Sequence, residues 1–156
     1  MGIEIERKYL VNLDQWQELE KPVGEMYRQG YLLTDPNKTI RVRQTKDKGF
    51  LTIKGLSVGA TRAEYEYEIP FDEAKKLLDQ FSISELSKIR YKIVFDNYLW
   101  EVDEFLADND GLIVAEIELS SEDENFSIPD WIEREVTSED KYYNSNLTIH
   151  PFKDWE

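Results

Sequence analysis

The segment at residues 2–11 carries two carboxylates and an ammonium group at alternate positions. If this segment is a β-strand, Glu4, Glu6 and Lys8 lie on one face of it, because successive side chains of a strand point to opposite faces. Two neighbouring carboxylates repel each other unless a positive group lies between them. Oxygen ligands are those that Mg²⁺ and Mn²⁺ prefer. The spacing therefore fits a divalent-metal site, and it also fits the solvated face of an edge strand.

Charged residues of one sign recur at alternate positions along much of the chain. The basic ladders are Arg41 with Arg43, Thr52 with Lys54, and Lys88 with Arg90 and Lys92; the acidic ladders are Glu64 with Glu66 and Glu68, Glu101 with Asp103, and Glu116 with Glu118. Arginine and lysine side chains bind phosphate, whereas carboxylates bind divalent cations. The basic ladders therefore predict phosphate contacts. The acidic ladders of segments 2–11, 97–106 and 112–120 predict metal ligands.

Two architectures are compatible with these ladders. In an ordinary sheet the apolar face forms the core and the charged face meets water. Alternatively, the sheet closes with its charged face inward, and helices cover the apolar outer face. An interior of unpaired charge is costly, but acidic and basic ladders that face each other across a wet channel compensate one another, and a polyanion with metal ions fills the gaps. The segregation of the ladders by sign favours this inverted barrel.

The chain shows more strand patterns than helix patterns. Strand patterns occur at residues 2–11, 25–33, 39–45, 49–55, 62–70, 87–95, 97–106 and 112–120, with short polar turns at 34–37, 46–49 and 108–111. Helices are expected to begin near Asp14, Asp72 and Ser138, residues suited to an N-cap or a first turn, and the third is expected to run as far as Leu147. We therefore predict an α+β fold: a single domain over residues 1–156, with an eight-stranded antiparallel β-barrel tunnel of charged interior, flanked by helices.

The composition excludes several classes of protein. The chain has no cysteine, and His150 is its single histidine, so disulfides, thiolate sites and a structural zinc site are excluded. The net charge of −14, from 33 acidic and 19 basic residues, argues against binding of duplex nucleic acid. No apolar run approaches the ~20 residues that span a bilayer, and no secretory leader opens the sequence. We therefore expect a soluble cytoplasmic protein, away from membranes, that is a monomer or a homodimer.

In their order along the chain, these motifs resemble the CYTH superfamily of triphosphate tunnel metalloenzymes. Glu4-x-Glu6-x-Lys8 is similar to the ExExK signature of that family, and the similarity continues through segments 40–43, 51–54, 62–66, 88–91, 100–103, 115–119, 135–137 and 143–144. ExExK alone is a short pattern, but the ordered set covers nearly the whole chain. The resemblance implies an eight-stranded barrel that forms an open-ended tunnel, a linear triphosphate as the small-molecule substrate, and Mg²⁺ or Mn²⁺ as the cofactor.

The resemblance also implies roles for individual residues. Those that match phosphate-binding positions are Lys8, Arg41, Arg43, Lys54, Lys88 and Arg90, and Lys92 extends the last of these ladders. Those that match metal-side acids are Glu4, Glu6, Asp103, Glu116 and Glu118. The expected catalytic residues are Lys8, Glu64, Glu66 and Asp103, together with Tyr31, which matches a tyrosine that partners the first-strand lysine in some members. The sequence leaves open which of the acids Glu64, Glu66 and Asp103 orients the attacking water.

The resulting expectation is metal-dependent hydrolysis of a linear triphosphate, first of all inorganic tripolyphosphate to pyrophosphate and phosphate. Such hydrolysis depends on positioning and charge neutralisation more than on covalent catalysis. The chain offers no cysteine, and His150 lies in a tail without pattern, so we expect attack by water. The alternatives are a thiamine triphosphatase, a nucleoside triphosphatase, a class IV-type adenylate cyclase of the same fold, and a non-catalytic polyphosphate-binding module. A pure anion binder has little use for the acidic ladders, which favours catalysis.

Overall fold

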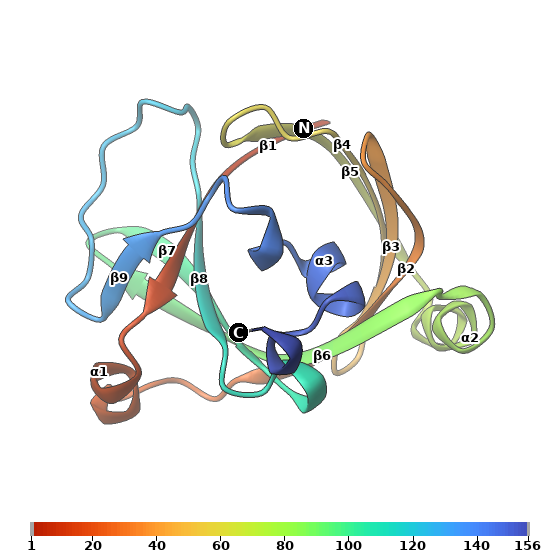
Figure 1. The fold of residues 1–156 in the computed structure, drawn as a ribbon, viewed down its shortest axis with the longest axis horizontal. Helices are drawn as coiled ribbons and strands as arrows, with labels where there is room; N and C mark the ends of the chain where they lie inside the picture. Colours follow the sequence, from red (N-terminus) through yellow and green to blue (C-terminus); the bar gives the residue numbers. More distant parts are fainter. Residues whose placement is uncertain (1, 156) are drawn as a thin grey trace.

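The strands of a computed structural model, which describes residues 2–155, form a closed antiparallel barrel (Figure 1). The eight barrel strands are β1 (Gly2–Val11), β2 (Glu25–Asp35), β3 (Lys38–Gln44), β4 (Gly49–Gly55), β5 (Thr61–Ile69), β6 (Ser84–Phe95), β7 (Tyr98–Phe105) and β8 (Ile113–Glu118). Their order around the barrel is β5-β4-β3-β2-β6-β7-β8-β1, and the ring closes where residues 2–5 of β1 pair with residues 61–64 of β5. The predicted fold class and the eight predicted strands are confirmed.

The register between strands sets charges of opposite sign side by side. Lys54 of β4 lies opposite Glu64 of β5, and Lys8 of β1 lies opposite Glu116 of β8. Arg90 of β6 lies opposite Asp103 of β7. Directly opposed residues of neighbouring strands are close enough to interact, and opposite charges there are favourable. The register therefore pairs part of each charged ladder with the opposite sign, although Glu101 lies opposite Glu116 and Glu6 lies opposite Glu118.

Helix α1 (Leu13–Glu18) packs on the outside of the barrel through a buried tryptophan. Its N-cap is Asn12, whose side chain accepts a hydrogen bond from the backbone N–H of Gln15, and Asp14 lies in the first turn. The ring of Trp16 is 1% exposed and packs edge-on against Tyr91 of β6. The Trp16 indole N–H also donates to a carboxylate oxygen of Glu104 at 2.6 Å. This helix therefore covers the apolar outer face near β6 and β7.

Helix α2 (Phe71–Phe81) covers a second part of the outer face, over β3 and β4, and much of β5 remains uncovered beside it. Ala74 and Leu78 of α2 are buried against Val42 of β3. By contrast, the outward-pointing Tyr65 and Tyr67 of β5 are 52% and 56% exposed. The expectation that helices cover the apolar outer face is therefore correct for part of the barrel and wrong for this part.

The C-terminal segment differs from the single helix expected between residues 138 and 147. A 3₁₀ helix (Asp140–Tyr142) and helix α3 (Asn144–Ile149) are separated at Tyr143, whose backbone is extended (φ −66°, ψ 136°). Ser138 caps neither of them. In Figure 1, α3 lies within the ring of strands, and it contacts β6 and β2. The break directs the tail into the barrel, as described below.

Three short elements were not predicted as such. Strand β9 (Ile132–Glu135) pairs with the end of β1 outside the eight-stranded ring, and 3₁₀ helices form at Ala107–Asn109 and Phe152–Asp154. The first of these 3₁₀ helices lies in the connection that had been expected to be a simple turn. Among residues 2–155, no helix combines the length and the apolar character needed to cross a bilayer.

One end of the barrel interior is packed with apolar side chains. Leu86, Phe105 and Val114 follow the inward-facing rows of β6, β7 and β8, and all three are at most 5% exposed. They form a single cluster with Tyr142 and Leu147 of the C-terminal segment, which we call the apolar plug. At this position the barrel interior is therefore occupied by packed apolar side chains, among them Leu147 of α3.

Candidate active site: a charged cavity inside the barrel

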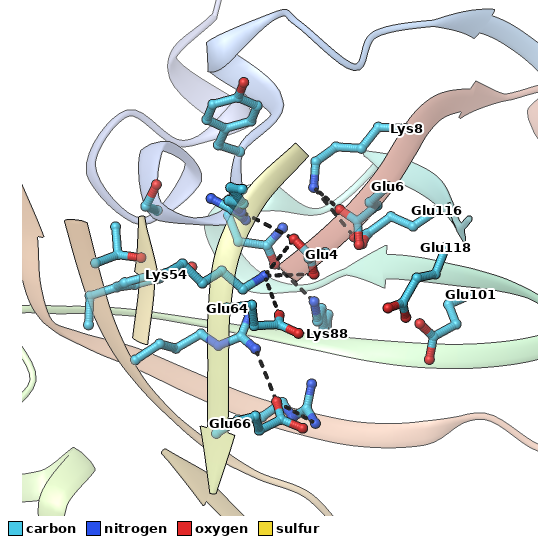
Figure 2. A pocket seen from close by; sticks show the side chains of 18 of the residues that line it. Glu4, Glu6, Lys8, Lys54, Glu64, Glu66, Lys88, Glu101, Glu116 and Glu118 are labelled. Atoms are coloured by element: carbon cyan, nitrogen blue, oxygen red, sulfur yellow. Dashed lines mark hydrogen bonds and ion pairs between the residues drawn. The ribbon is translucent and has the colours of Figure 1, made fainter. Parts of the chain in front are cut away.

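The rest of the barrel interior is a cavity of about 220 Å³ lined by charged side chains (Figure 2). The acids of the lining are Glu4, Glu6, Glu64, Glu66, Glu101, Glu116 and Glu118, and the bases are Lys8, Arg41, Arg43, Lys54, Arg62, Lys88 and Arg90. Thr39, Tyr31, Tyr143, Asn144 and Ser145 complete the lining. Charged residues at alternate positions thus point inward, as the inverted barrel predicts. The acids and bases are equal in number, although the whole chain carries a net charge of −14.

The side chain of Lys54 bridges two carboxylates at the β1–β5 seam. Its ammonium nitrogen lies 3.2 Å from a carboxylate oxygen of Glu4 and 3.2 Å from one of Glu64, as Figure 2 shows. Arg62 approaches Glu4 from the other side at 3.1 Å. Although burial opposes ionisation, the Lys54 charge lowers the pKa of Glu4 to about 2. Burial and the neighbouring Glu4 raise the pKa of Glu64 to about 7, so the two acids of this group differ in proton affinity.

A second group of charges lies on β1 and β8. The Lys8 ammonium is 3.1 Å from Glu6 and 3.7 Å from Glu116. Although burial alone would lower it, these two acids raise the pKa of Lys8. Burial and the nearby Glu6 carboxylate raise the pKa of Glu116. Glu118, on the same face of β8, also has a pKa raised by burial and then by Glu4. These carboxylates crowd one another around one lysine.

A third group contains Asp103, and its geometry does not fit the role expected for this residue. Asp103 is fully buried and does not line the cavity. Its two oxygens accept from Arg90 at 2.8 and 2.9 Å, and Lys88 lies 2.8 Å away. Although burial opposes ionisation, Arg90 and then Lys88 lower the pKa of Asp103. Because both oxygens are occupied by cations of the protein, Asp103 orients Arg90 and Lys88, and it is poorly placed to bind a metal or a water in the cavity.

Arg41 and Arg43 of β3 lack close counter-ions. Their guanidinium groups lie 3.9 Å and 3.8 Å from the same carboxylate, that of Glu66. The Nε atoms of both arginines are buried and have no hydrogen-bond partner among the described residues. Side chains in this state have donors to spare for an anionic ligand. These two arginines are therefore the clearest anion-binding groups of the cavity.

Two predicted site residues lie differently from the expectation. Lys92 is exposed, and it is not among the residues that line the cavity. Tyr31 does line the cavity, but no hydrogen bond joins it to Lys8 within the described residues. The ring that lies near the Lys8 ammonium is that of Tyr143, at 5.9 Å from its centroid. The C-terminal segment thus supplies the aromatic neighbour that the resemblance assigned to Tyr31.

Several lining residues were not among the predicted site residues. Glu101 belongs to a ladder that the period of two had already marked, and Arg62 lies two residues before Glu64 on the same face of its strand, so the spacing could have identified both. Asn144 could not be found in that way. Its side-chain oxygen accepts from Gln29 at 2.8 Å and from Lys88 at 2.9 Å, which ties α3 to the inner wall of the barrel. Gln29 is fully buried, and no charge pattern points to it.

The carboxylates fit a divalent cation that arrives together with phosphate. No three or more His, Asp or Glu side chains in the 2–155 range converge into a ready-made metal site. Mg²⁺ commonly takes one or two protein carboxylates and completes its coordination with water and substrate phosphates. The pairs Glu6 with Glu116 and Glu4 with Glu64 supply hard oxygen donors of this kind.

Comparisons with known proteins identify relatives along the whole chain. A family model described as the CYTH domain matches residues 2–148. The inorganic triphosphatase of Acetivibrio thermocellus is 50% identical over 157 residues, which cover 100% of this chain and 99% of the relative. The inorganic triphosphatase of Nitrosomonas europaea is 34% identical over 154 residues, which cover 94% and 97%. The crystal structure of an inorganic triphosphatase matches with a TM-score of 0.65 at 32% identity and covers 94% of each chain.

Proposed function

This chain belongs to the CYTH domain family, and from its charged cavity we propose that it hydrolyses inorganic tripolyphosphate to pyrophosphate and phosphate with the help of a divalent metal ion. The observation that carries this proposal is the composition of the cavity wall, in which anion-binding bases and cation-binding acids surround one space. An anion-binding module needs the bases alone. A wall that also holds seven acids is suited to a substrate that brings cations with it.

The bases of the wall position the phosphate chain. Arg41 and Arg43 offer guanidinium N–H groups that are not engaged in tight ion pairs. Arg90 is oriented by its bidentate contact with Asp103, and its other terminal nitrogen lies 3.3 Å from a carboxylate oxygen of Glu101 at the cavity wall. Guanidinium groups match phosphate oxygens in geometry, and fixed groups need no reorganisation when charge develops during the reaction. These arginines therefore bind and align the substrate, and Lys54 and Lys88 add charge beside them.

Glu6, Glu116, Glu118 and Glu4 are the residues that would hold Mg²⁺ or Mn²⁺. When bound, such an ion neutralises phosphate charge and polarises the phosphoryl oxygens. The raised pKa values of Glu116 and Glu118 reflect burial and crowding by other acids, which is the state that a bound cation relieves. Lys8 holds Glu6 and Glu116 in place from the side of the plug.

The attacking group in this proposal is water. The chain has no cysteine, and His150 is exposed in the C-terminal segment, away from the cavity lining. Of the three acids considered for orienting the water, Asp103 is occupied by Arg90 and Lys88, whereas Glu64 and Glu66 line the cavity. Glu64 has a pKa of about 7, which suits a group that accepts a proton near neutral pH. Glu64 and Glu66 are thus the candidates for this role.

Release of phosphate from a panel of substrates tests the proposal. Tripolyphosphate, pyrophosphate, ATP and thiamine triphosphate are each incubated with Mg²⁺, with Mn²⁺ or with a chelator. We expect the highest kcat/KM for tripolyphosphate with a metal and loss of activity with the chelator. Glu66→Gln is compared with Glu68→Gln, which changes the next acid of the same ladder outside the cavity lining. Full activity in chelator refutes the metal assignment, and tight binding of tripolyphosphate without hydrolysis favours a binding module.

A further inference from the structure

The ring of Tyr27 lies between two of the cavity arginines. Tyr27 belongs to β2, which has β3 on one side and β6 on the other. The guanidinium carbon of Arg43, from β3, is 4.9 Å from the centroid of the Tyr27 ring, and that of Arg90, from β6, is 5.2 Å from it. Both distances are within the range of a cation–π contact. A single aromatic side chain thus contacts a cation from each neighbouring strand.

Arg43 depends on aromatic rings more than Arg90 does. A second ring, that of Phe50, lies 4.9 Å from the Arg43 guanidinium. The nearest acid is Glu66 at 3.8 Å, and the buried Nε atom of Arg43 has no hydrogen-bond partner among the described residues. Arg90, in contrast, is held by two hydrogen bonds to Asp103. The two rings, together with the ion pair to Glu66, are therefore the groups that hold the Arg43 guanidinium in place.

The surroundings of Arg43 are otherwise unfavourable to a cation. Burial and the charges of Arg41 and Arg90 lower the pKa of Arg43. The negative face of an aromatic ring attracts a guanidinium group from above its plane. The N–H groups of the guanidinium lie in that plane, so this contact does not use them. Tyr27 is only 4% exposed, so its ring acts in a desolvated place where such contacts are strongest.

We propose that Tyr27 is a positioning residue for tripolyphosphate binding: its ring holds Arg43 and Arg90 together in the cavity wall without occupying their N–H groups, so that Arg43 keeps its N–H groups for phosphate oxygens. The inference rests on the proposed function, because it gives these arginines a phosphate to bind. A leucine in this place fills similar space but offers no negative ring face. The ring, and neither the volume nor the hydroxyl group, is what the site requires.

Steady-state kinetics with tripolyphosphate separate these possibilities. In Tyr27→Leu we expect KM to rise about tenfold with kcat within about threefold of wild type, because weakened substrate binding appears in KM. Tyr27→Phe keeps the ring, and its KM is expected to stay within about twofold of wild type. Tyr67→Leu, which removes an exposed ring from the outer face, is the control and leaves both constants unchanged. A KM for Tyr27→Leu equal to that of wild type overturns the inference, and so does a KM for Tyr27→Phe as high as that of Tyr27→Leu.

Two further measurements keep the test decisive. If Tyr27→Leu does not fold, Phe50→Leu removes the other ring from Arg43, and we expect its KM to rise about threefold. An unchanged KM in that variant overturns the inference. If wild type releases no phosphate, the proposed function fails, and calorimetric titration of wild type and Tyr27→Leu with tripolyphosphate still tests the ring. Weaker binding by the variant supports the inference, and equal binding overturns it.

Discussion

Val114 and Glu116 lie two residues apart on the same inward face of β8, and they belong to different regions of the barrel. Val114 is part of the apolar plug with Leu147 of α3, whereas Glu116 lies beside Lys8 and Arg90 in the wall of the charged cavity. The inward face of β6 changes in the same way, because Leu86 belongs to the plug and Lys88, two residues later, lines the cavity. The difference teaches that one row of side chains serves packing at one end of the barrel and chemistry at the other.

The two regions contribute differently to stability. Burial of apolar side chains in the plug is favourable in proportion to the area removed from water. Buried ion pairs of the cavity gain attraction, but they lose hydration of a similar magnitude. We therefore expect the plug to contribute more to the free energy of unfolding than the cavity does. The cavity charges are expected to serve ligand binding. Variants placed in each region make this contrast measurable.

The largest effect is expected from Glu116→Gln. The substitution removes a carboxylate proposed to hold the metal while it keeps the shape of the side chain, and kcat/KM for tripolyphosphate should fall by about 10²–10³. The free energy of unfolding should change little, because burial already raises the pKa of Glu116 and so disfavours its charged form. Phosphate release and urea unfolding provide the two measurements.

Val114→Ala is the matched variant in the plug. It leaves a cavity among packed apolar side chains, so the free energy of unfolding should fall by about 2 kcal/mol, with turnover retained at temperatures where the protein is folded. If Val114→Ala abolishes turnover while Glu116→Gln keeps it, the division of the barrel interior into these two regions is wrong.

A smaller effect concerns Lys88, a buried lysine of the cavity that lies next to the plug. Burial lowers the pKa of Lys88 to about 7, whereas a lysine in an unfolded chain titrates near 10.4, so the unfolded chain binds more protons between about pH 7 and pH 10. The free energy of unfolding therefore rises with pH across this window, and in Lys88→Met the rise should be smaller. Urea unfolding at several pH values measures it, with Lys92→Met as the control for loss of one lysine. Equal slopes in wild type and Lys88→Met contradict the expected environment of Lys88.

The smallest effect is expected from Lys92→Ala. Lys92 continues the ladder of Lys88 and Arg90 along β6, but it is exposed and lies outside the cavity lining. An exposed charge at the rim is screened by solvent, so KM for tripolyphosphate should change by less than about twofold. The comparison variant is Arg90→Ala, whose KM should rise clearly. A similar rise in KM in both variants would show that Lys92 also contributes to substrate binding.

Much of the site could be predicted because charge and strand period coincide. The spacing of Glu4, Glu6 and Lys8 placed them on one face of a predicted strand, and all three line the cavity. Asp103 has the same spacing relative to Glu101, yet it is enclosed by Arg90 and Lys88. The spacing gives no sign of this difference, because it depends on how strands that are distant in sequence pair with one another. Only the register of β6 against β7 shows that Arg90 lies opposite Asp103, and therefore that the oxygens of Asp103 are not free.

The C-terminal segment shows the same limit more clearly. Its sequence pattern was interpreted as one helix on the barrel, whereas the chain extends at Tyr143 and carries Asn144 into the cavity. A local pattern describes which residues can form a turn of helix. A local pattern contains no information about where the segment packs in the barrel, because its place depends on the space that the eight strands leave between them.

The amino-acid sequence by itself determined that charged and apolar side chains alternate along eight strands, since a strand sends neighbouring residues to opposite sides. Only the tertiary structure decided which side faces inward, where along each strand the charges give way to the plug, and which charges keep free donors or acceptors. The physical reason is that alternation is a local property of the backbone. Closure of the barrel, the register between strands and the burial of charge are free energies of the whole assembly.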